Sequence, residues 1–214
     1  MFWTTALLLV IPLTSAANWE VLSYRNIPTH TVRFDSDGLR VGVDRSAAPI
    51  VYPLASAQRV RGLRAKGRID GQLLTTAARQ GQPGADDYVL RVGLVEVGSR
   101  RPGWMERRLA PAWMRRLFAL APANTGIAGI RFFNVGLAPG QTGRSRQHPA
   151  SDLIVERIVS VPDADGRITM AVDLDAPIQT SAIWISADGD DTGSRFTLTL
   201  DRLELLLDEP ADGQ

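Results

Sequence analysis

Short apolar runs that alternate with polar residues dominate this 214-residue chain, and turn residues separate the runs about every 8 to 12 positions. Side chains on a β-strand point alternately to its two faces, so each run has one apolar and one polar face. Apolar spacing of the helical kind is almost absent. The sequence therefore predicts an all-β sandwich. In the first clear hairpin, the predicted turn is Asp37-Gly38 and one face carries Val32, Phe34, Leu39, Val41 and Val43.

Further strands are expected along the rest of the chain. Their ranges are 50–54, 58–69, 87–97, 127–137, 152–161, 167–174, 181–186 and 195–206. In the last of these the alternation changes phase, which predicts a β-bulge near Asp201-Arg202. The run 87–97 is apolar on both faces, as expected of a central strand that is covered on each side.

The N-terminus carries an apolar run, Ala6 to Leu13, followed by small residues that suit signal peptidase. The run is too short to span a bilayer, and no later segment is long and apolar enough to do so. No Lys or Arg precedes the run, which departs from the usual signal-peptide pattern. We therefore expect a signal peptide at 1–17, one β-sandwich domain at 18–208 and a flexible tail at 209–214, with a periplasmic or secreted location. The chain has no cysteine, which excludes disulfides and thiolate sites.

One segment, about 102–121, breaks the β pattern and contains the near-repeat WMERRLA and WMRRLFA. Pro111 should split it into two short helices. Three interpretations stay open: a helical cap that buries its Trp and Met side chains, a basic aromatic surface for anionic lipid or a protein partner, and a platform that stacks sugars. The residues predicted for the lipid or partner surface are Trp104, Arg107, Arg108, Trp113, Arg115 and Arg116.

Charge is unevenly distributed, although the net charge is only +1. Residues 58–146 contain 16 Lys or Arg and 5 Asp or Glu, whereas residues 147–214 contain 4 and 14. Strands from both halves can interleave in one sandwich and neutralise each other, and the alternative is a basic patch that faces an anionic partner. The overall balance carries no signal for nucleic acid, and we expect no nucleic-acid partner.

Catalytic equipment is sparse. The two histidines, His30 and His148, form no metal-binding pair, and His148 lies in a polar stretch that we expect to be solvated. No nucleophile elbow or phosphate-binding glycine loop occurs. A glycan hydrolase would need two carboxyl groups across a cleft. Asp86 or Asp87 could supply one and Asp190 or Asp191 the other, although acidic residues at a strand entrance are more often exposed turn residues.

The loop DGDDTGS, residues 188–194, resembles the first half of a calcium-binding loop at Asp188 and Asp190. The position where an EF-hand has its bidentate glutamate holds Thr199, and the flanking residues are strand-like. We therefore expect Asp188 and Asp190 to accept hydrogen bonds from backbone amides, with a structural calcium ion as the minority interpretation and no other cofactor.

Several motifs together resemble an exported bacterial family, domain of unknown function 3047. The motifs are DDYVLRVGLVEV, the aromatic strand IRFFNVGL with the residues that follow it, and IWISADGDDTGS before the last strand. The resemblance maps the family pattern onto Asp86, Asp87, Arg91, Phe132, Phe133, Asp188, Asp190, Asp191, Thr192 and Gly193. It implies a jelly-roll sandwich of the galactose-binding-like type and an exported protein, and it implies no activity. The segment 102–121 departs from the pattern.

The sequence favours a non-catalytic binding module for a carbohydrate or a cell-envelope glycan. The candidate ligand-binding residues are Asp86, Asp87, Tyr88, Arg91, Trp184, Asp188, Asp190 and Asp191. Two alternatives remain: an envelope-associated protein that contacts anionic lipid or a protein partner through the basic aromatic segment, and a carboxylate-based glycan hydrolase.

Overall fold

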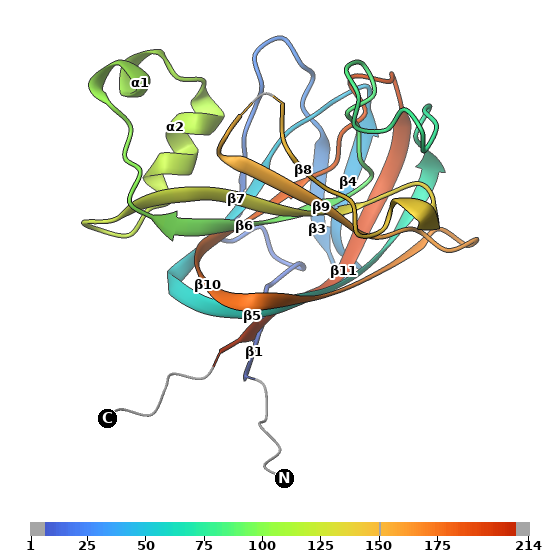
Figure 1. Ribbon diagram of the computed structural model, residues 1–214. Coiled ribbons are helices and arrows are strands. Elements are labelled where there is room, and N and C mark those ends of the chain that lie inside the picture. Colours follow the sequence, from blue (N-terminus) through green and yellow to red (C-terminus); the bar gives the residue numbers. More distant parts are fainter. Residues whose placement is uncertain (1–6, 150, 209–214) are drawn as a thin grey trace.

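The computed structural model describes residues 7–149 and 151–208 and shows an all-β fold with a short helical insertion (Figure 1). The predicted tail and the first residues of the predicted signal peptide lie outside this part. The strands are β1 (Leu7–Val10), β2 (Glu20–Val21), β3 (Thr31–Asp35), β4 (Gly38–Asp44), β5 (Ile50–Gln72), β6 (Arg91–Gly98), β7 (Gly126–Val135), β8 (Ser145–Gln147), β9 (Ile154–Ser160), β10 (Arg167–Ser186) and β11 (Arg195–Leu207). The helices are α1 (Trp104–Leu109), α2 (Ala112–Ala119) and the 3-10 turn η1 (Pro139–Gln141).

The strands form one mixed sheet in the order β3-β4-β11-β5-β10-β6-β7-β9-β8, with β1 beside β11 and β2 beside β5. All described neighbours are antiparallel except β7 and β9. The sheet curls strongly, and Figure 1 shows β5 and β10 sweeping round beneath β6 and β7. Strands from distant positions in the sheet, such as β4 and β6, therefore share one core. This is the predicted jelly-roll β-sandwich, made from a single curled sheet.

Two long strands replace four of the predicted ones. The runs 50–54 and 58–69 are parts of β5, and 167–174 and 181–186 are parts of β10. The ladder between β5 and β10 shifts register between Asp173 and Ile178, and Pro177 lies within this irregular stretch. Proline lacks a backbone N–H and fits such bulges, so it bends the strand without ending it. The predicted bulge near Asp201-Arg202 is confirmed, because the register of β11 against β5 shifts between Leu200 and Arg202.

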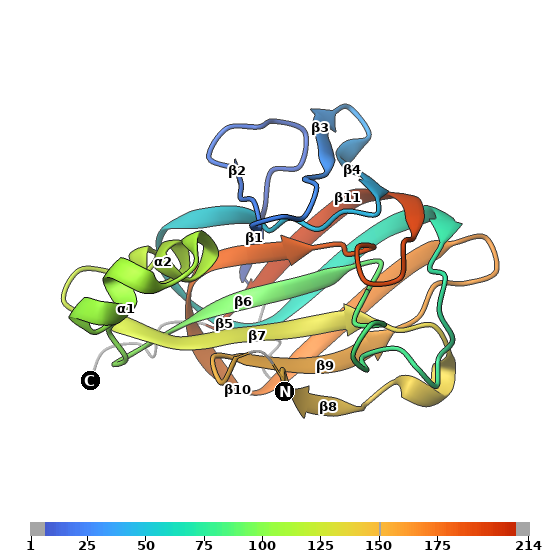
Figure 2. The ribbon, with the colours of Figure 1, turned by 90° about the horizontal axis from the view of Figure 1, so that it is seen from above.

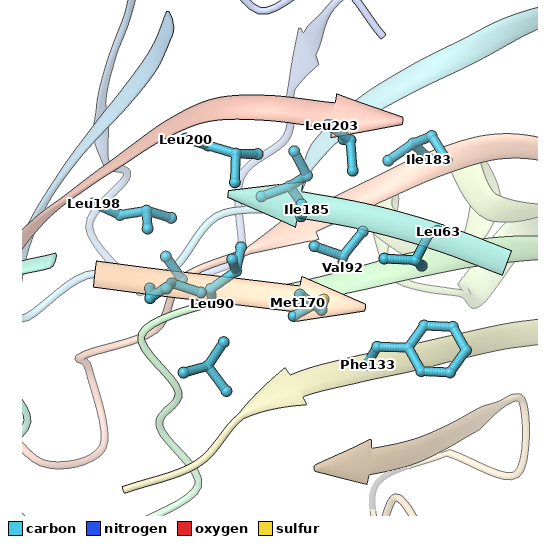
Figure 3. Close-up of a cluster of buried hydrophobic side chains, with 14 of the residues drawn as sticks. Leu63, Leu90, Val92, Phe133, Met170, Ile183, Ile185, Leu198, Leu200 and Leu203 are labelled. Carbon is cyan, nitrogen blue, oxygen red and sulfur yellow. The ribbon is translucent and has the colours of Figure 1, made fainter. Parts of the chain in front are cut away.

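The inner core fills the space inside the curled sheet (Figure 3). It draws alternate residues from neighbouring strands, for example Val92 and Leu94 of β6, Ile183 and Ile185 of β10 and Phe133 of β7. The hairpin of β3 and β4 also packs the predicted face against this core, with Val32 and Phe34 partly buried. Its turn is at Ser36-Asp37, one residue earlier than expected. A protein without cysteine depends on such a core for its stability.

A second apolar cluster, the outer cluster, lies on the opposite face of β6, β7 and β10. It contains Val95, Ile130, Phe132 and Trp184, which alternate along their strands with inner-core residues. Helix α2 covers this cluster with Leu117 and Phe118. Because β6 is covered on both faces, the expectation of a central strand is confirmed.

The helical insertion divides at Pro111 as expected, and its two helices differ in their contacts. Helix α2 is the predicted cap: Trp113 and Met114 are half-buried, and Arg116 forms an ion pair with Glu20 (Nη2–Oε1 2.6 Å). Helix α1 projects at one end of the sheet (Figures 1 and 2), and Trp104 and Met105 are exposed. The expectation that the cap buries both Trp-Met pairs is therefore wrong for the first pair.

The N-terminal run is built into the fold over its described part. Strand β1 pairs with β11, from Leu7 opposite Leu207 to Val10 opposite Glu204. Ile11 and Leu13 are buried in the inner core. Cleavage after residue 17 stays a prediction, and it would remove one strand and two core side chains. In the described residues, no helix has the length and apolar character needed to cross a membrane.

Candidate binding pocket

A pocket of about 380 Å³ opens beside the outer cluster, on the face formed by β6, β7 and β10. It brings together seven of the eight predicted ligand residues, which are Asp86, Asp87, Arg91, Trp184, Asp188, Asp190 and Asp191. They come from the loop before β6, from β6 and β10 themselves, and from the loop after β10. The eighth, Tyr88, is buried with its ring 4.4 Å from the Arg91 guanidinium carbon.

Strand register explains why these side chains meet. Arg91 of β6 lies opposite Ser186 of β10, and two residues further along Gly93 lies opposite Trp184. Side chains two residues apart share a face, so Arg91, Trp184 and Ser186 all point toward the pocket. On the other side of β6, Gly93 lies opposite Phe132 of β7. A Cβ atom at Gly93 would lie 2.7 Å from the Phe132 ring, so this glycine makes room for one wall of the pocket.

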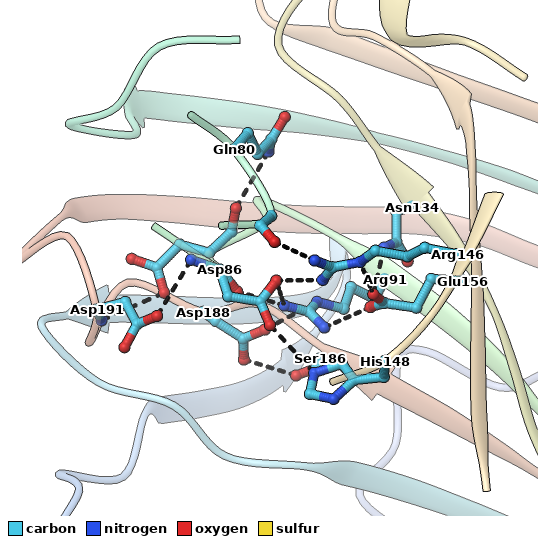
Figure 4. A network of polar contacts seen from close by, with 12 residues as sticks. Gln80, Asp86, Arg91, Asn134, Arg146, His148, Glu156, Ser186, Asp188 and Asp191 are labelled. Atoms are coloured by element: carbon cyan, nitrogen blue, oxygen red, sulfur yellow. Dashed lines mark hydrogen bonds and ion pairs between the residues drawn. The ribbon is translucent and has the colours of Figure 1, made fainter. Parts of the chain in front are cut away.

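Arg91 is the centre of a buried ionic network (Figure 4). Its Nη1 atom lies 2.6 Å from Glu156 Oε1, and its Nε atom lies 3.1 Å from Asp188 Oδ2. Asn134 donates a hydrogen bond of 3.2 Å to the same Glu156 oxygen. Burial disfavours the charged guanidinium, but the charges of Asp188 and Glu156 raise the pKa of Arg91 above its usual value. Arg91 therefore ties β9 and the loop after β10 to its own strand, β6.

A second arginine completes the network from the strands at the sheet edge. Arg146 of β8 donates from Nε to Glu156 Oε2 (2.6 Å) and also pairs with Asp86. His148 Nε2 lies 3.1 Å from Asp86 Oδ2, so the expectation of a solvated His148 is wrong. Burial acts to raise the pKa of Asp86, but His148, Arg91 and Arg146 outweigh it and lower this pKa to about 2. Asp86 is therefore ionised and fixed in place.

Asp188 and Asp190 differ from Asp86. Burial raises the pKa of Asp188 to about 6, although Arg91 and a hydrogen bond from Ser186 (2.7 Å) oppose this shift. Burial also raises the pKa of Asp190, and the neighbouring charge of Asp87 adds to the effect. Asp190 is half-buried and lines the pocket with Asp191. These two carboxyl groups therefore line the pocket and are open to solvent in part.

The loop DGDDTGS is held mainly by Asp87, which is buried rather than an exposed turn residue. Its carboxylate accepts hydrogen bonds from the Thr192 amide (2.8 Å) and hydroxyl (2.5 Å) and from the Asp191 amide (3.3 Å). Asp191 in turn accepts the amide of Asp86 (3.1 Å). Asp87 and Asp191 therefore anchor backbone amides here, and a backbone hydrogen bond also acts on the carboxyl group of Asp190. Asp188, which was expected in this role, pairs with Arg91 instead.

A structural calcium ion at Asp188 and Asp190 stays a prediction. A calcium ion at Asp188 and Asp190 would compete with Arg91 for the Asp188 oxygens. Among the described residues, one group of possible metal ligands has donor atoms within 4.8 Å of one another, namely Asp86, His148 and Glu156. Arg91 and Arg146 already pair with Asp86 and Glu156, so the site carries its own cations. This donor set does not fit an added metal ion.

Aromatic side chains form the other walls of the pocket. Trp184 and Phe132 line the pocket but are almost fully buried. Trp113 of α2 and Tyr24 from the loop after β2 are half-buried and line it more openly. Trp184, a predicted ligand-binding residue, is therefore less accessible in the pocket than Trp113. The insertion thus contributes directly to the pocket.

Sequence reasoning missed several network residues. Glu156 is an acidic residue in an apolar strand, and alternation places it on one face with Ile154 and Ile158. That pattern could have identified it as a buried charge that needs a partner. Arg146 and His148 lie in a polar loop whose spacing carries no such signal, and only the fold brings them to Asp86.

No protein-family model matches this chain, and no curated protein matches it. Similar solved structures include a xylan-binding module, CBM15, with 10% identity, a TM-score of 0.41 and coverage of 97% of this chain and 100% of that one. The exoplasmic/lumenal domain of VIP36 in its Ca²⁺/Man3GlcNAc-bound form has 11% identity and a TM-score of 0.41. The match covers 96% of this chain and 90% of that one. A mutant xylanase 10C from Cellvibrio japonicus in complex with xylopentaose has 9% identity and a TM-score of 0.37. That match covers 96% of this chain and 29% of the xylanase chain. At these scores and identities, no ligand or activity is transferred to this chain.

Proposed function

We propose that this protein is a non-catalytic glycan-binding β-sandwich and that the pocket holds one or two sugar rings. One observation supports this most: half-buried aromatic side chains and carboxyl groups line a single pocket of about 380 Å³. Small-molecule pockets span about 300–1,000 Å³, so this one suits a small ligand or the end of a longer glycan. Sugars need both kinds of group, because their rings carry apolar C–H faces and polar hydroxyls.

The proposed roles follow from exposure and from existing hydrogen bonds. Trp113 and Tyr24 would contact the apolar face of a sugar ring. Asp190 and Asp191 would accept hydrogen bonds from hydroxyl groups, which are stronger when the acceptor is charged. The Arg91 network would hold the loops around the pocket in place before the ligand arrives. Such preorganisation lowers the entropic cost of binding.

A glycan hydrolase is less well supported. The acid in such an enzyme must keep its proton near neutral pH, and its partner must face it across the bond. Asp86 is ionised, because its pKa is lowered to about 2 by His148 and the two arginines against the effect of burial. Asp87 uses its carboxylate to hold Thr192 and Asp191. Neither Asp86 nor Asp87 can therefore supply the acid, which would have to be Asp190, whose pKa is raised by burial, or Asp191.

Export and membership of domain of unknown function 3047 remain part of this proposal. They rest on the apolar N-terminal run and on the motifs around Asp86, Arg91 and Asp188. A periplasmic or secreted protein would meet cell-envelope and environmental glycans, which suits the proposed ligand.

Calorimetric titration tests the proposal with a panel of xylan, mannan and agarose oligosaccharides and peptidoglycan fragments. At least one ligand should bind, and Asp190→Ala should weaken it about tenfold or more, since charged hydrogen bonds contribute about 1.5–3 kcal/mol. Trp113→Ala should weaken it as well. Trp104→Ala is the matched control, because Trp104 is exposed on α1 and does not line the pocket. A panel without any binding, or equal binding by all three variants, would contradict the proposal.

A further inference from the structure

Helix α1 leaves its large apolar side chains in solvent. Trp104 is 70% exposed and Leu109 is 74% exposed, and Met105 beside them is also exposed. In α2, by contrast, Leu117 and Phe118 are buried in the outer cluster. Contiguous apolar side chains on a protein surface commonly mark a contact with a membrane or a partner. The fold itself makes no use of these three side chains.

Arginines neighbour this apolar group in the sequence. The segment from Arg100 to Arg116 contains six arginines and one acidic residue. Arg100 and Arg116 form ion pairs with Asp152 and Glu20, which neutralise them. Arg107, Arg108 and Arg115 have exposed side chains. We call Trp104, Met105, Leu109 and these three arginines the α1 surface, and it is both apolar and positively charged.

We propose that the α1 surface docks on an anionic lipid bilayer. Trp, Met and Leu would enter the boundary between headgroups and acyl chains, and the arginines would contact lipid phosphates. A stable protein interface buries about 800 Å² on each partner, which is more than three apolar side chains on a six-residue helix can supply. Shallow insertion supported by several charges needs no such area. The small apolar area therefore favours the bilayer over a protein partner, and the arginines complement the negative charge of its lipids.

The docking would place the pocket beside the bilayer. Helix α2 follows α1 after Pro111, and its Trp113 lines the pocket. Glycans anchored at the membrane would then be within reach of the pocket. The docking itself does not depend on glycan binding, because none of the residues of the α1 surface lines the pocket.

Sedimentation with vesicles tests the proposal on the full chain. The protein should pellet with vesicles of equal parts phosphatidylcholine and phosphatidylglycerol and stay in solution with phosphatidylcholine alone. Raising the salt to about 1 M shortens the Debye length to about 3 Å and should release it. Arg107→Gln with Arg108→Gln should weaken binding about thirtyfold, since each basic residue near an anionic surface contributes about 1 kcal/mol.

Two further variants distinguish binding through the α1 surface from a general attraction between the vesicles and positive charge anywhere on the protein. Arg33→Gln with Arg40→Gln removes the same charge from exposed positions on β3 and β4 and should leave binding unchanged. Trp104→Ala should weaken binding without affecting the fold, because this side chain is exposed. Absence of vesicle binding, equal binding to phosphatidylcholine alone, or an equal loss in the control variant would each overturn the proposal. Glycan titration of the same variants shows separately whether the pocket still works.

Discussion

Arg91 is the side chain on which the pocket depends most. It is buried, and its guanidinium pairs with Glu156 and Asp188 and stacks on Tyr88. Removing one partner of a buried ion pair leaves an uncompensated charge, which costs about 3–5 kcal/mol. We expect Arg91→Gln to lower the free energy of unfolding in urea by roughly this amount.

Arg131 of the neighbouring strand is the matched control for this change. It pairs with Glu96 at 3.0 Å, but its side chain is 44% exposed. Exposed pairs contribute about 0–1 kcal/mol, so Arg131→Gln should change the stability little. Equal losses in the two variants would show that the Arg91 network is not buried as described.

Asp188 gives the stability a pH dependence of known sign. Burial raises its pKa to about 6 from an ordinary value of 3.8, so the folded state holds this proton more tightly than the unfolded state. The stabilisation from this proton is fully present below the ordinary pKa of 3.8, and it is lost as the pH rises through 6. His30 acts in the opposite direction, because burial lowers its pKa to about 4 and protonation in the unfolded state destabilises the fold as pH falls.

We therefore expect Asp188→Asn to change the slope of stability against pH. Between pH 4 and pH 6 the variant should gain more stability with rising pH than the wild type, because the opposing contribution of Asp188 is gone. Urea midpoints across this range measure the slope. Asp173→Asn removes an exposed carboxylate and should keep the wild-type slope. A parallel pair of curves for Asp188→Asn and the wild type would refute the role of Asp188.

Strand β1 raises the question of what happens to the N-terminus. Ile11 donates its amide to Leu203 of β11 (2.9 Å) and buries its side chain in the inner core, whereas its neighbour Val10 is exposed. If this segment belongs to the folded protein, Ile11→Ala should cost about 2–5 kcal/mol. Val10→Ala should stay within about 0.5 kcal/mol.

Thermal unfolding of the purified protein, with its intact mass recorded, measures this difference. A mature protein that lacks residues 1–17 would make both variants indistinguishable from the wild type, and would confirm cleavage. A large loss for Ile11→Ala alone would show that the segment is retained as a strand.

The sequence predicted local features of the elements well. Alternation identified the buried faces of β4 and β6, and its change of phase located the bulge beside Arg202. It did not reveal that β5 and β10 are continuous, because proline and polar residues at a bulge look like the end of a strand. The two-helix insertion followed from Pro111. Which of its tryptophans faces the pocket depends on how α2 packs, and sequence spacing does not determine that.

The pocket was predictable in part. Asp87, Arg91 and Asp188 stood out because charged residues flank or interrupt apolar strands. Glu156, the partner of Arg91, and Arg146, which pairs with Glu156, come from β9 and β8 at the far edge of the sheet. That pairing depends on the strand order, and no local pattern encodes it.

The molecule as a whole neutralises its uneven charge through contacts between its two halves. Arg64 pairs with Asp173, Arg91 with Glu156, and Arg100 with Asp152. Each of these pairs joins the basic middle of the chain to its acidic C-terminal part. Interleaved strands therefore account for much of the charge asymmetry, and the α1 surface is where exposed arginines gather beside apolar side chains.

The proposed glycan pocket is tested most directly by NMR of the tryptophan indole N–H groups during titration with an oligosaccharide that binds. Trp113 and Trp184 line the pocket, whereas Trp19 packs against Phe34 and Tyr52, and Trp104 is exposed on α1. The signals of Trp113 and Trp184 should shift together with a single dissociation constant, and those of Trp19 and Trp104 should stay in place. Shifts confined to Trp19 or Trp104, with the pocket signals unchanged, would contradict the proposed site.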